Sequence, residues 1–177
     1  MSVTVNASLA AWNAAGESAA LEAMIACCGA KRWAAEMVAL RPFGNVEELS
    51  EAADRVWSTM QETDWLEAFA CHPRIGGGIG ERKIAHAVAQ SAAWSKQEQS
   101  RTSSASKDVM AQIAEGNRQY EERFGFTYII CATGKSAEEM LAILKRRLGA
   151  TRDAELREAA EQQRQILQIR LGKWLAT

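Results

Sequence analysis

The residue in this sequence whose position first suggests chemistry is His72, which stands directly before Pro73. The chain contains only two histidines and two prolines. Because a proline disfavours helical backbone for the residue before it, we expect an incoming helix to end here and to leave the imidazole on non-helical backbone. Histidine is the side chain that most readily exchanges a proton near neutral pH, so His72 is a candidate acid or base. The alternative is a structural histidine, which is how we interpret His86.

A second group of candidate residues follows a glycine-rich run at residues 76–80, where the backbone can approach a ligand closely. Ser95, Glu98 and Gln99 then place a hydroxyl, a carboxylate and an amide close together in the sequence. Such groups can bind and orient a small polar substrate. The same S-x-x-E spacing is also the signature of a capping box, in which Glu98 bonds the backbone amide of Ser95 at the start of a helix. The residues alone leave both interpretations open.

Arg170 is the candidate for binding an anionic group. A helix is expected over about residues 151–174, and its apolar stripe includes Leu167 and Trp174. Helical spacing places Arg170 on the same inward face as these two residues. An arginine there extends its guanidinium to water, pairs with an internal carboxylate, or binds a ligand through its planar fork. The sequence does not choose among these three roles.

Hydrophobic spacing typical of helices runs along nearly the whole chain. The exception is residues 124–131, F-G-F-T-Y-I-I-C, whose aromatic and β-branched side chains favour extended backbone. One extended segment cannot form a sheet, so we predict an all-α, single-domain bundle of about eight to nine helices over residues 1–177. A modest helix around residues 84–88 and a loop over residues 97–107 are part of this prediction. The side chains expected to begin or end helices are Ser8, Gly29, Asn45, Thr63 and Ser136.

Composition and length exclude several classes of protein. With 177 residues, 47% hydrophobic residues and a net charge of −1, the sequence fits one folded domain and argues against a nucleic-acid-binding surface. No apolar run approaches the ~20 residues of a membrane-spanning helix, and the N-terminal sequence M-S-V-T-V-N lacks the features of a signal peptide. The four cysteines form no C-x-x-C pair and no metal-ligand spacing. We therefore expect a cytoplasmic, metal-free protein that binds neither nucleic acid nor membrane.

Five short motifs in a fixed order suggest a family. They are F-x-x-H-P from Phe69, S-x-x-E-Q from Ser95, F-G-F-x-Y-I-I-C-A from Phe124, R-L from Arg147 and I-R-L from Ile169. Together they resemble 2-oxo-4-hydroxy-4-carboxy-5-ureidoimidazoline (OHCU) decarboxylase, the last enzyme of the route from urate to allantoin. The resemblance covers nearly the whole chain. It implies an all-helical domain, usually a homodimer, that works without metal or organic cofactor.

The resemblance also implies a role for each candidate residue. It assigns catalysis to His72 and Glu98, with Glu98 orienting the ureidoimidazoline substrate or the histidine. Substrate binding falls to the following residues: Pro73, Ser95, Gln99, Thr127, Ile129 and Arg170. Loss of CO2 next to a ring carbonyl leaves electrons that the carbonyl accepts as an enolate, which is then protonated on one face to give S-allantoin. Because the substrate supplies its own electron sink, no pyridoxal, thiamine or flavin is expected.

Two other functions fit the same residues. One is a cofactor-free lyase or hydrolase that uses His72 and Glu98 on another small ring. The other is a non-catalytic helical interaction module, in which Arg170 and Glu98 only form ion pairs. A polar pocket containing His72 and Arg170 would favour an enzyme, whereas a stripe of exposed apolar side chains would favour the interaction module.

Overall fold

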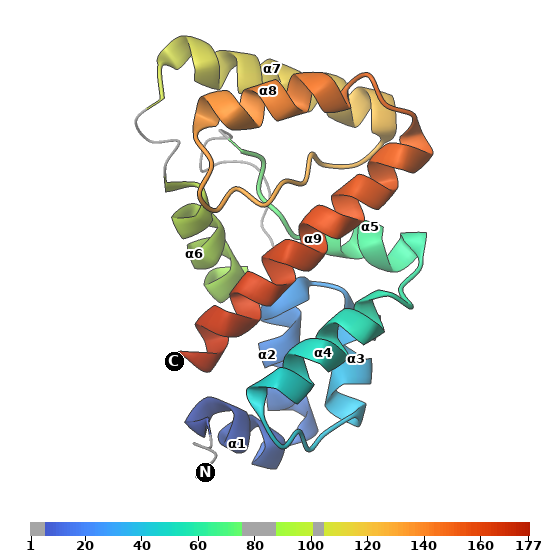
Figure 1. The fold of residues 1–177 in the computed structure, drawn as a ribbon, viewed down its shortest axis with the longest axis vertical. Coiled ribbons are helices and arrows are strands. Elements are labelled where there is room, and N and C mark those ends of the chain that lie inside the picture. Colours follow the sequence, from blue (N-terminus) through green and yellow to red (C-terminus); the bar gives the residue numbers. More distant parts are fainter. Residues whose placement is uncertain (1–5, 76–87, 101–104) are drawn as a thin grey trace. The chain divides into compact units, whose positions relative to one another are not determined.

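The computed structural model describes residues 6–75, 88–100 and 105–177 of the chain (Figure 1). These residues contain nine helices and no strand, which confirms the predicted all-α class and the predicted number of helices. The glycine-rich run at residues 76–80 and the expected helical positions Ile84 and His86 lie outside the described residues. In the described part of the chain, no helix is both long enough and apolar enough to cross a bilayer.

The nine helices range in length from 8 residues in α1 to 24 residues in α9. In chain order they are α1 (Ala7–Ala14), α2 (Glu17–Cys28), α3 (Lys31–Ala39), α4 (Val46–Trp57), α5 (Glu62–Ala70), α6 (Val88–Glu98), α7 (Lys107–Phe124), α8 (Ala137–Arg147) and α9 (Arg152–Leu175). The last helix begins and ends within one residue of the helix predicted over residues 151–174.

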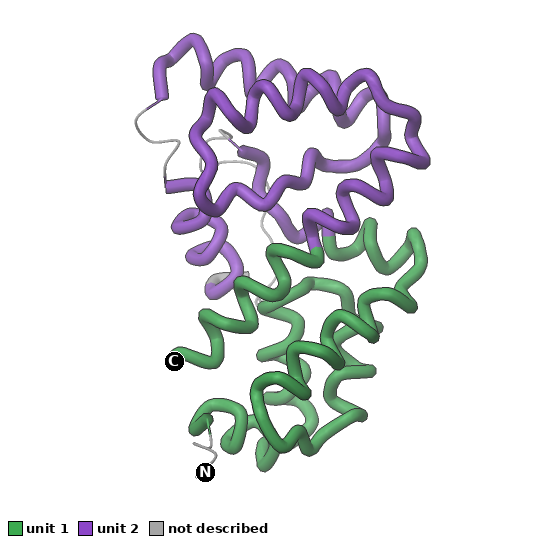
Figure 2. The backbone as a smooth tube through the Cα atoms, in the orientation of Figure 1, with its two compact units in different colours: residues 1–68, 164–177 green, residues 69–163 purple. Residues whose placement is uncertain are grey.

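The chain divides into two compact units (Figure 2). Unit 1 comprises Met1–Ala68 and Arg164–Thr177, and unit 2 comprises Phe69–Gln163. Two helices, α5 and α9, contribute residues to both units. Each unit has its own buried side chains. The extent of a single domain over residues 1–177 stays a prediction.

In unit 1, one helix ends and another begins at residues that the sequence predicts. Gly29 follows α2 with a φ of 88°, a left-handed backbone that glycine adopts without steric cost. Asn45 caps α4, because its side-chain oxygen accepts a hydrogen bond from the backbone N–H of Glu48 at 2.8 Å. The Glu48 carboxylate in turn accepts from the backbone N–H of Gly44 at 2.8 Å. These contacts lie within a few residues of one another, which is why the sequence predicts them.

Two predicted caps in unit 1 are wrong. Ser8 lies inside α1, and Asn6 caps this helix instead by accepting a hydrogen bond from a first-turn amide at 2.9 Å. Thr63 lies inside α5, where the carboxylate of Asp64 accepts from the backbone N–H of Gln61 at 2.9 Å. At α1 asparagine takes the role because it caps helices at least as well as serine does, whereas at α5 the contact comes from Asp64 in the first turn, which bonds back to the residue before the helix.

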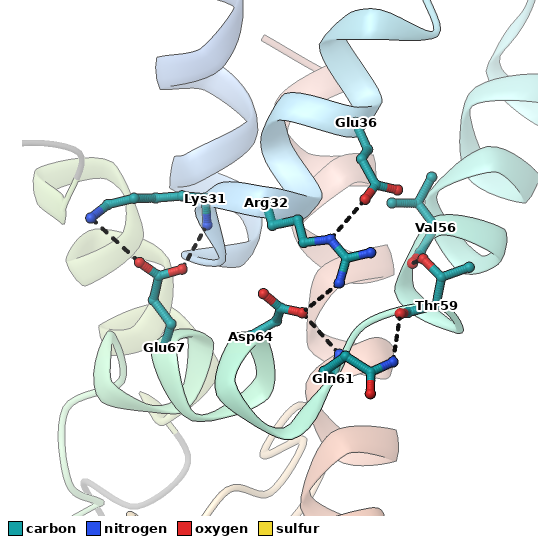
Figure 3. A network of polar contacts seen from close by, with 8 residues as sticks. All are labelled: Lys31, Arg32, Glu36, Val56, Thr59, Gln61, Asp64 and Glu67. Carbon is teal, nitrogen blue, oxygen red and sulfur yellow. Dashed lines mark hydrogen bonds and ion pairs between the residues drawn. The ribbon is translucent and has the colours of Figure 1, made fainter.

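Charged side chains join α3 to α5 on the surface of unit 1 (Figure 3). Arg32 of α3 lies 3.0 Å from Glu36 and 3.2 Å from Asp64 of α5. Lys31 lies 3.4 Å from Glu67. Because most of these side chains keep substantial contact with water, the ion pairs contribute little to the stability of the unit.

The core of unit 1 includes Trp33 of α3, which is fully buried. Its indole N–H donates to the carbonyl of Ala53 at 3.1 Å, so the ring is buried with its polar group satisfied. Burial of large apolar side chains contributes roughly 1.5–3 kcal/mol each, which outweighs the surface ion pairs. Further fully buried apolar side chains of this unit are Met24, Met37, Leu49 and Leu167.

Aromatic side chains dominate the core of unit 2, with Tyr120 of α7 at their centre. Its ring centroid lies 4.7 Å from that of Phe124, 5.6 Å from that of Phe126 and 5.2 Å from that of Tyr128. These are favourable distances for tilted and edge-to-face aromatic pairs. Helix α7 ends at Phe124, and Gly125 follows with a φ of 82°. Residues 127–132 then form neither helix nor strand, in agreement with the predicted break in the helical pattern.

Helix α8 is held against α7 by a close approach and begins at a predicted cap. A Cβ at Gly116 of α7 would lie 2.6 Å from Cδ2 of Leu144, so any larger residue there would require the Leu144 side chain to shift. At the start of α8, the hydroxyl of Ser136 accepts from the backbone N–H of Glu139 at 3.2 Å, and the Glu139 carboxylate accepts from the backbone N–H of Ser136 at 2.6 Å. This confirms the predicted capping box.

Candidate functional site

His72 lies on non-helical backbone, as its position before Pro73 predicts. Helix α5 ends at Ala70, and the backbone N–H of His72 donates to the carbonyl of Phe69 at 3.1 Å. The imidazole is partly exposed. Its Nε2 atom lies 2.6 Å from Oε1 of Gln163, so the ring is held in one orientation by a side chain of α9.

Gln163 is a site residue that sequence reasoning missed. It is fully buried, at 0% exposure, and it lies at the end of unit 2. The signal was present, because a glutamine interrupts the inward-facing stripe of α9 between Ala160 and Leu167. A buried amide needs hydrogen-bond partners, so a polar residue on such a stripe points to a contact with another element. The partner, His72, is 91 residues away and could not be named from spacing.

Ser95 and Glu98 do not form a capping box, so that interpretation is wrong. Both lie inside α6, Ser95 one turn before its end and Glu98 at its last residue, whereas a capping box stands at the start of a helix. Ser95 is 2% exposed, and its backbone carbonyl accepts from the N–H of Gln99 at 3.0 Å. Glu98 and Gln99 are partly exposed. The polar composition of residues 97–107 led us to end the helix too early, whereas burial of Trp94 and Ser95 accompanies a helix that continues to Glu98.

The segment that carries Thr127 and Ile129 is held by side chains from two helices. Nη1 of Arg147, the last residue of α8, donates to the carbonyl of Ile129 at 2.7 Å. Oε1 of Gln162 on α9 accepts from the backbone N–H of Cys131 at 2.9 Å. Thr127 is partly exposed, whereas Ile129 is buried. The backbone that the family resemblance places at the substrate is thus held at Ile129 and just beyond it at Cys131.

A buried ion pair supports this arrangement. Arg147 and Glu155 are 4% and 1% exposed and form an ion pair inside unit 2. The hydroxyl of Tyr120 donates to the same carboxylate at 2.6 Å, and the guanidinium lies 4.9 Å from the ring centroid of Tyr128. Burial works most strongly against the charge of Arg147, but the hydrogen bond to Glu155 and the electrostatic interactions with Tyr120, Glu155 and Tyr128 together outweigh it, so the pKa of Arg147 is raised. Burial also raises the pKa of Tyr120, with the charge of Arg147 opposing it. Both groups therefore keep their protons across the physiological range.

Arg170 lies on the inward face of α9, as predicted, and belongs to unit 1. It is 1% exposed, so its guanidinium does not reach water and the interpretation that it extends to solvent is wrong. Pairing with an internal carboxylate and binding of a ligand both remain as interpretations. Burial raises the pKa of the Cys27 thiol to about 12, with Cys28 adding to the shift and the charge of Arg170 acting against it. Cys27 therefore stays a neutral thiol.

The predicted site residues are distributed over both units. Seven of the eight belong to unit 2, and Arg170 belongs to unit 1. Three hydrogen bonds within unit 2 hold predicted site residues or their neighbours. Helix α9 holds the ring of His72 and the backbone of Cys131, and α8 holds the backbone of Ile129. Among the residues that the structure describes, no three histidine, cysteine, aspartate or glutamate side chains gather where they could hold a metal ion. The seven residues in unit 2 are His72, Pro73, Ser95, Glu98, Gln99, Thr127 and Ile129.

Comparison with known proteins identifies the family. A family model described as OHCU decarboxylase matches residues 13–172. The chain belongs to the OHCU decarboxylase family. The resemblance drawn from the five sequence motifs is thereby confirmed.

Two relatives and a solved structure match most of this chain. The uric acid degradation bifunctional protein TTL of Arabidopsis thaliana is 35% identical over 155 residues, which cover 83% of this chain and 44% of that protein. The chain therefore spans less than half the length of this relative. A 2-oxo-4-hydroxy-4-carboxy-5-ureidoimidazoline decarboxylase of Amia calva is 29% identical over 131 residues, covering 74% of this chain and 73% of that protein. A crystal structure of OHCU decarboxylase in the presence of (S)-allantoin matches with a TM-score of 0.74 and 32% identity, covering 88% of this chain and 99% of the other.

Proposed function

We propose that this protein is a carboxy-lyase that decarboxylates OHCU to S-allantoin in the breakdown of urate. The observation that carries the proposal is the match to an OHCU decarboxylase whose crystal structure was determined in the presence of (S)-allantoin. That match covers 99% of the other chain, so it extends over a whole decarboxylase. The relative from Arabidopsis thaliana is named for uric acid degradation, which supports the same pathway.

The described surface supports an enzyme over a helical interaction module. Large hydrophobic side chains are exposed at two described positions, Leu40 and Val46, which flank the connection between α3 and α4. They do not form a stripe along a helix, as a docking face for a partner helix requires. The two named relatives and the structural match are also named for a degradative or decarboxylating activity.

The residues of unit 2 fit the steps that this reaction needs. Departure of CO2 from C4 leaves an electron pair that the adjacent C5=N double bond of the imidazoline ring accepts, which gives an enol-type intermediate, so the protein must orient the ring and deliver one proton to C5. His72 is partly exposed on fixed backbone and relays that proton. Glu98 orients the ureido N–H groups or the histidine, and Ser95 and Gln99 hold the ring. Because the substrate accepts the electrons itself, the reaction runs without an organic cofactor.

The remaining substrate contacts are assigned by the family resemblance. Pro73 and the backbone of Thr127 and Ile129 border the ring, and the guanidinium of Arg170 binds its carboxylate or ureido oxygens. A planar guanidinium is suited to this task because its fork donates two parallel hydrogen bonds to an anionic group. Each of these assignments is a proposal for a named residue and can be tested by substitution.

The proposed assembly and location also come from the resemblance. We expect a homodimer, which light scattering on a size-exclusion column would report as a mass of about twice 19.4 kDa. A single mass of 19.4 kDa over a range of protein concentrations would contradict the dimer. A cytoplasmic location, with no membrane or nucleic-acid partner, stays a prediction.

The deciding experiment supplies freshly prepared OHCU to the purified protein and follows circular dichroism as allantoin forms. The expected result is allantoin of one hand, formed much faster than in a protein-free control. Consumption of OHCU at the rate of the control, or formation of both hands in equal amounts, would contradict the proposed function. In a second arm, dialysis against EDTA leaves the rate unchanged if no metal takes part. Recovery of lost activity on adding a divalent ion would contradict the cofactor-free mechanism.

A further inference from the structure

The contact between His72 and Gln163 indicates which nitrogen of the imidazole carries the hydrogen. Nε2 of the imidazole lies 2.6 Å from Oε1 of the amide, which is a short hydrogen bond. An amide oxygen can only accept, so the hydrogen between these atoms belongs to the imidazole Nε2. A neutral imidazole carries one hydrogen, and in this tautomer the Nδ1 atom therefore keeps its lone pair.

The chemical nature of glutamine makes it suited to this task. A carboxylate in the same place would favour the charged imidazolium, whereas an amide accepts the same hydrogen bond without adding a charge. Gln163 is 0% exposed, so water does not compete for its oxygen. The short contact favours the tautomer that donates from Nε2 to this buried oxygen.

The same turn of α9 fixes a second segment of unit 2. Gln162 precedes Gln163, and its Oε1 accepts from the backbone N–H of Cys131 at 2.9 Å. The amide nitrogen of Gln162 donates to Glu158 at 3.0 Å, which orients the side chain along the helix. Two successive glutamines of one helix thus hold the ring of His72 and the end of the segment that carries Ile129. Their spacing sets the position of the imidazole relative to that backbone.

We propose that Gln163 is a positioning residue that holds His72 in the Nε2–H tautomer and leaves Nδ1 to exchange the proton with the substrate. The role of Nδ1 rests on the proposed decarboxylase function, whereas the tautomer does not. When Nδ1 takes up a proton, the ring becomes an imidazolium that still donates from Nε2 to Gln163. When Nδ1 releases that proton to the substrate, the original tautomer returns. Gln163 itself neither gains nor loses a proton in this cycle.

The tautomer can be read directly by NMR on protein labelled with ¹⁵N-histidine. The chain has two histidines, so the spectrum contains two imidazole patterns, and a His86→Gln variant identifies that of His72. Spectra are recorded at a pH at which the His72 ring is neutral. The expected pattern is that of an imidazole protonated at Nε2. A pattern of protonation at Nδ1 in the unmodified protein would overturn the proposal without further variants.

Three variants connect the tautomer to the reaction. Gln163→Met keeps a similar length and removes the acceptor, so we expect the Nδ1–H tautomer to gain population. We expect kcat to fall about 10–100-fold, which is the effect of losing a residue that orients a metal-ligating histidine. Gln163→Glu keeps an acceptor and should restore the Nε2–H pattern. Gln168→Met removes another hydrogen-bonded glutamine of α9, one that contacts Ser50 and Asp54, and serves as the matched control with kcat unchanged.

The outcomes separate this proposal from the proposed function. If Gln163→Met keeps both the Nε2–H pattern and kcat, Gln163 does not position the ring and the proposal is overturned. If that variant does not fold, the spectrum of the unmodified protein still decides the tautomer. If the unmodified protein shows the Nε2–H pattern but does not convert OHCU, the proposed function fails while the tautomer assignment stands.

Discussion

Two non-helical segments, residues 40–45 in unit 1 and residues 127–131 in unit 2, are both held by side chains from distant helices, but by different chemistry. In unit 1, the amide of Asn13 donates to the carbonyl of Phe43 at 2.9 Å and accepts from its N–H at 3.1 Å. In unit 2, the charged Arg147 donates to the carbonyl of Ile129 at 2.7 Å and is itself paired with Glu155. The first contact is neutral and partly open to water, whereas the second is charged and buried.

This difference predicts which of the two contacts costs more stability when one partner is removed. Removing one partner of a neutral, partly exposed hydrogen bond costs little, because water takes its place. Removing one partner of a buried ion pair leaves an uncompensated charge, which costs several times more. We therefore expect the segment that carries Thr127 and Ile129, the residues assigned to the substrate, to depend more strongly on its single charged contact. The segment in unit 1 has no assigned contact with substrate. A rigid backbone at a binding site is what pre-organised recognition requires.

The largest effect is expected for His72→Asn. This variant tests whether a residue of unit 2 can be essential for the decarboxylation rate without contributing to stability. Because His72 is partly exposed and follows the end of α5, the melting temperature should change little. The rate of OHCU decarboxylation should fall by about 10²–10⁴-fold, the usual contribution of a general acid or base. His86→Asn is the matched control and should keep full activity. Retention of more than about a tenth of kcat by His72→Asn would remove this residue from the proton-transfer step.

The next largest effect is expected for Arg147→Met, which removes the charged contact of the comparison. The change strands the buried carboxylate of Glu155 and should lower the free energy of unfolding by about 3–5 kcal/mol. Urea denaturation measures this loss. Arg118→Met removes an arginine whose ion pairs lie on the surface of the same unit and should leave the urea midpoint nearly unchanged.

A double variant tests the reason given for that loss. Adding Glu155→Gln to Arg147→Met removes the stranded charge while leaving an acceptor for the hydroxyl of Tyr120. Part of the lost stability should therefore return. If the double variant is less stable than Arg147→Met alone, the ion pair is not what holds this segment.

How far the sequence predicts these features depends on the distance between partners along the chain. The all-α class, the ends of α2 and α9, and the cap at Asn45 follow from spacing and from residues a few positions apart. The break after α7 follows from the composition of residues 124–131. Sequence reasoning also placed Arg170 on an inward face correctly, because that face is defined by its neighbours on the same helix.

The features that sequence reasoning missed depend on partners far apart in the chain. Gln163 bonds a residue 91 positions away, and Gln162 bonds one 31 positions away. Periodicity identifies a polar residue on a buried face but does not name its partner. The end of α6 was misplaced for a related reason, because burial of Ser95 in the folded unit outweighs the polar composition that follows it. Tertiary contacts override local preference in such cases.

A third prediction concerns Arg170, which is a buried charged residue in unit 1. It tests whether a buried charge stabilises unit 1 as the Arg147 ion pair is expected to stabilise unit 2. If Arg170 binds substrate, Arg170→Met keeps the apolar part of the side chain and leaves stability the same or slightly higher. Substrate affinity should then fall by about 2–5 kcal/mol. If Arg170 instead pairs with an internal carboxylate, the change strands that carboxylate and stability drops by about 3–5 kcal/mol. Melting temperature and inhibitor affinity, measured on one preparation, distinguish the two. A destabilised protein whose folded fraction binds normally would contradict the substrate role.

The smallest effect is expected for Asn13→Ala, which removes the neutral contact of the comparison. Two hydrogen bonds to the backbone of Phe43 are lost, but both lie where water can replace them in part. The free energy of unfolding should fall by about 1–2 kcal/mol, with OHCU turnover by the folded protein unchanged. Asn13→Asp keeps the acceptor and loses only the donor, so it should cost about half as much. A loss of stability as large as that of Arg147→Met would show that residues 40–45 are held as firmly as residues 127–131. The charge of the Arg147 contact would then not explain a difference between the two segments.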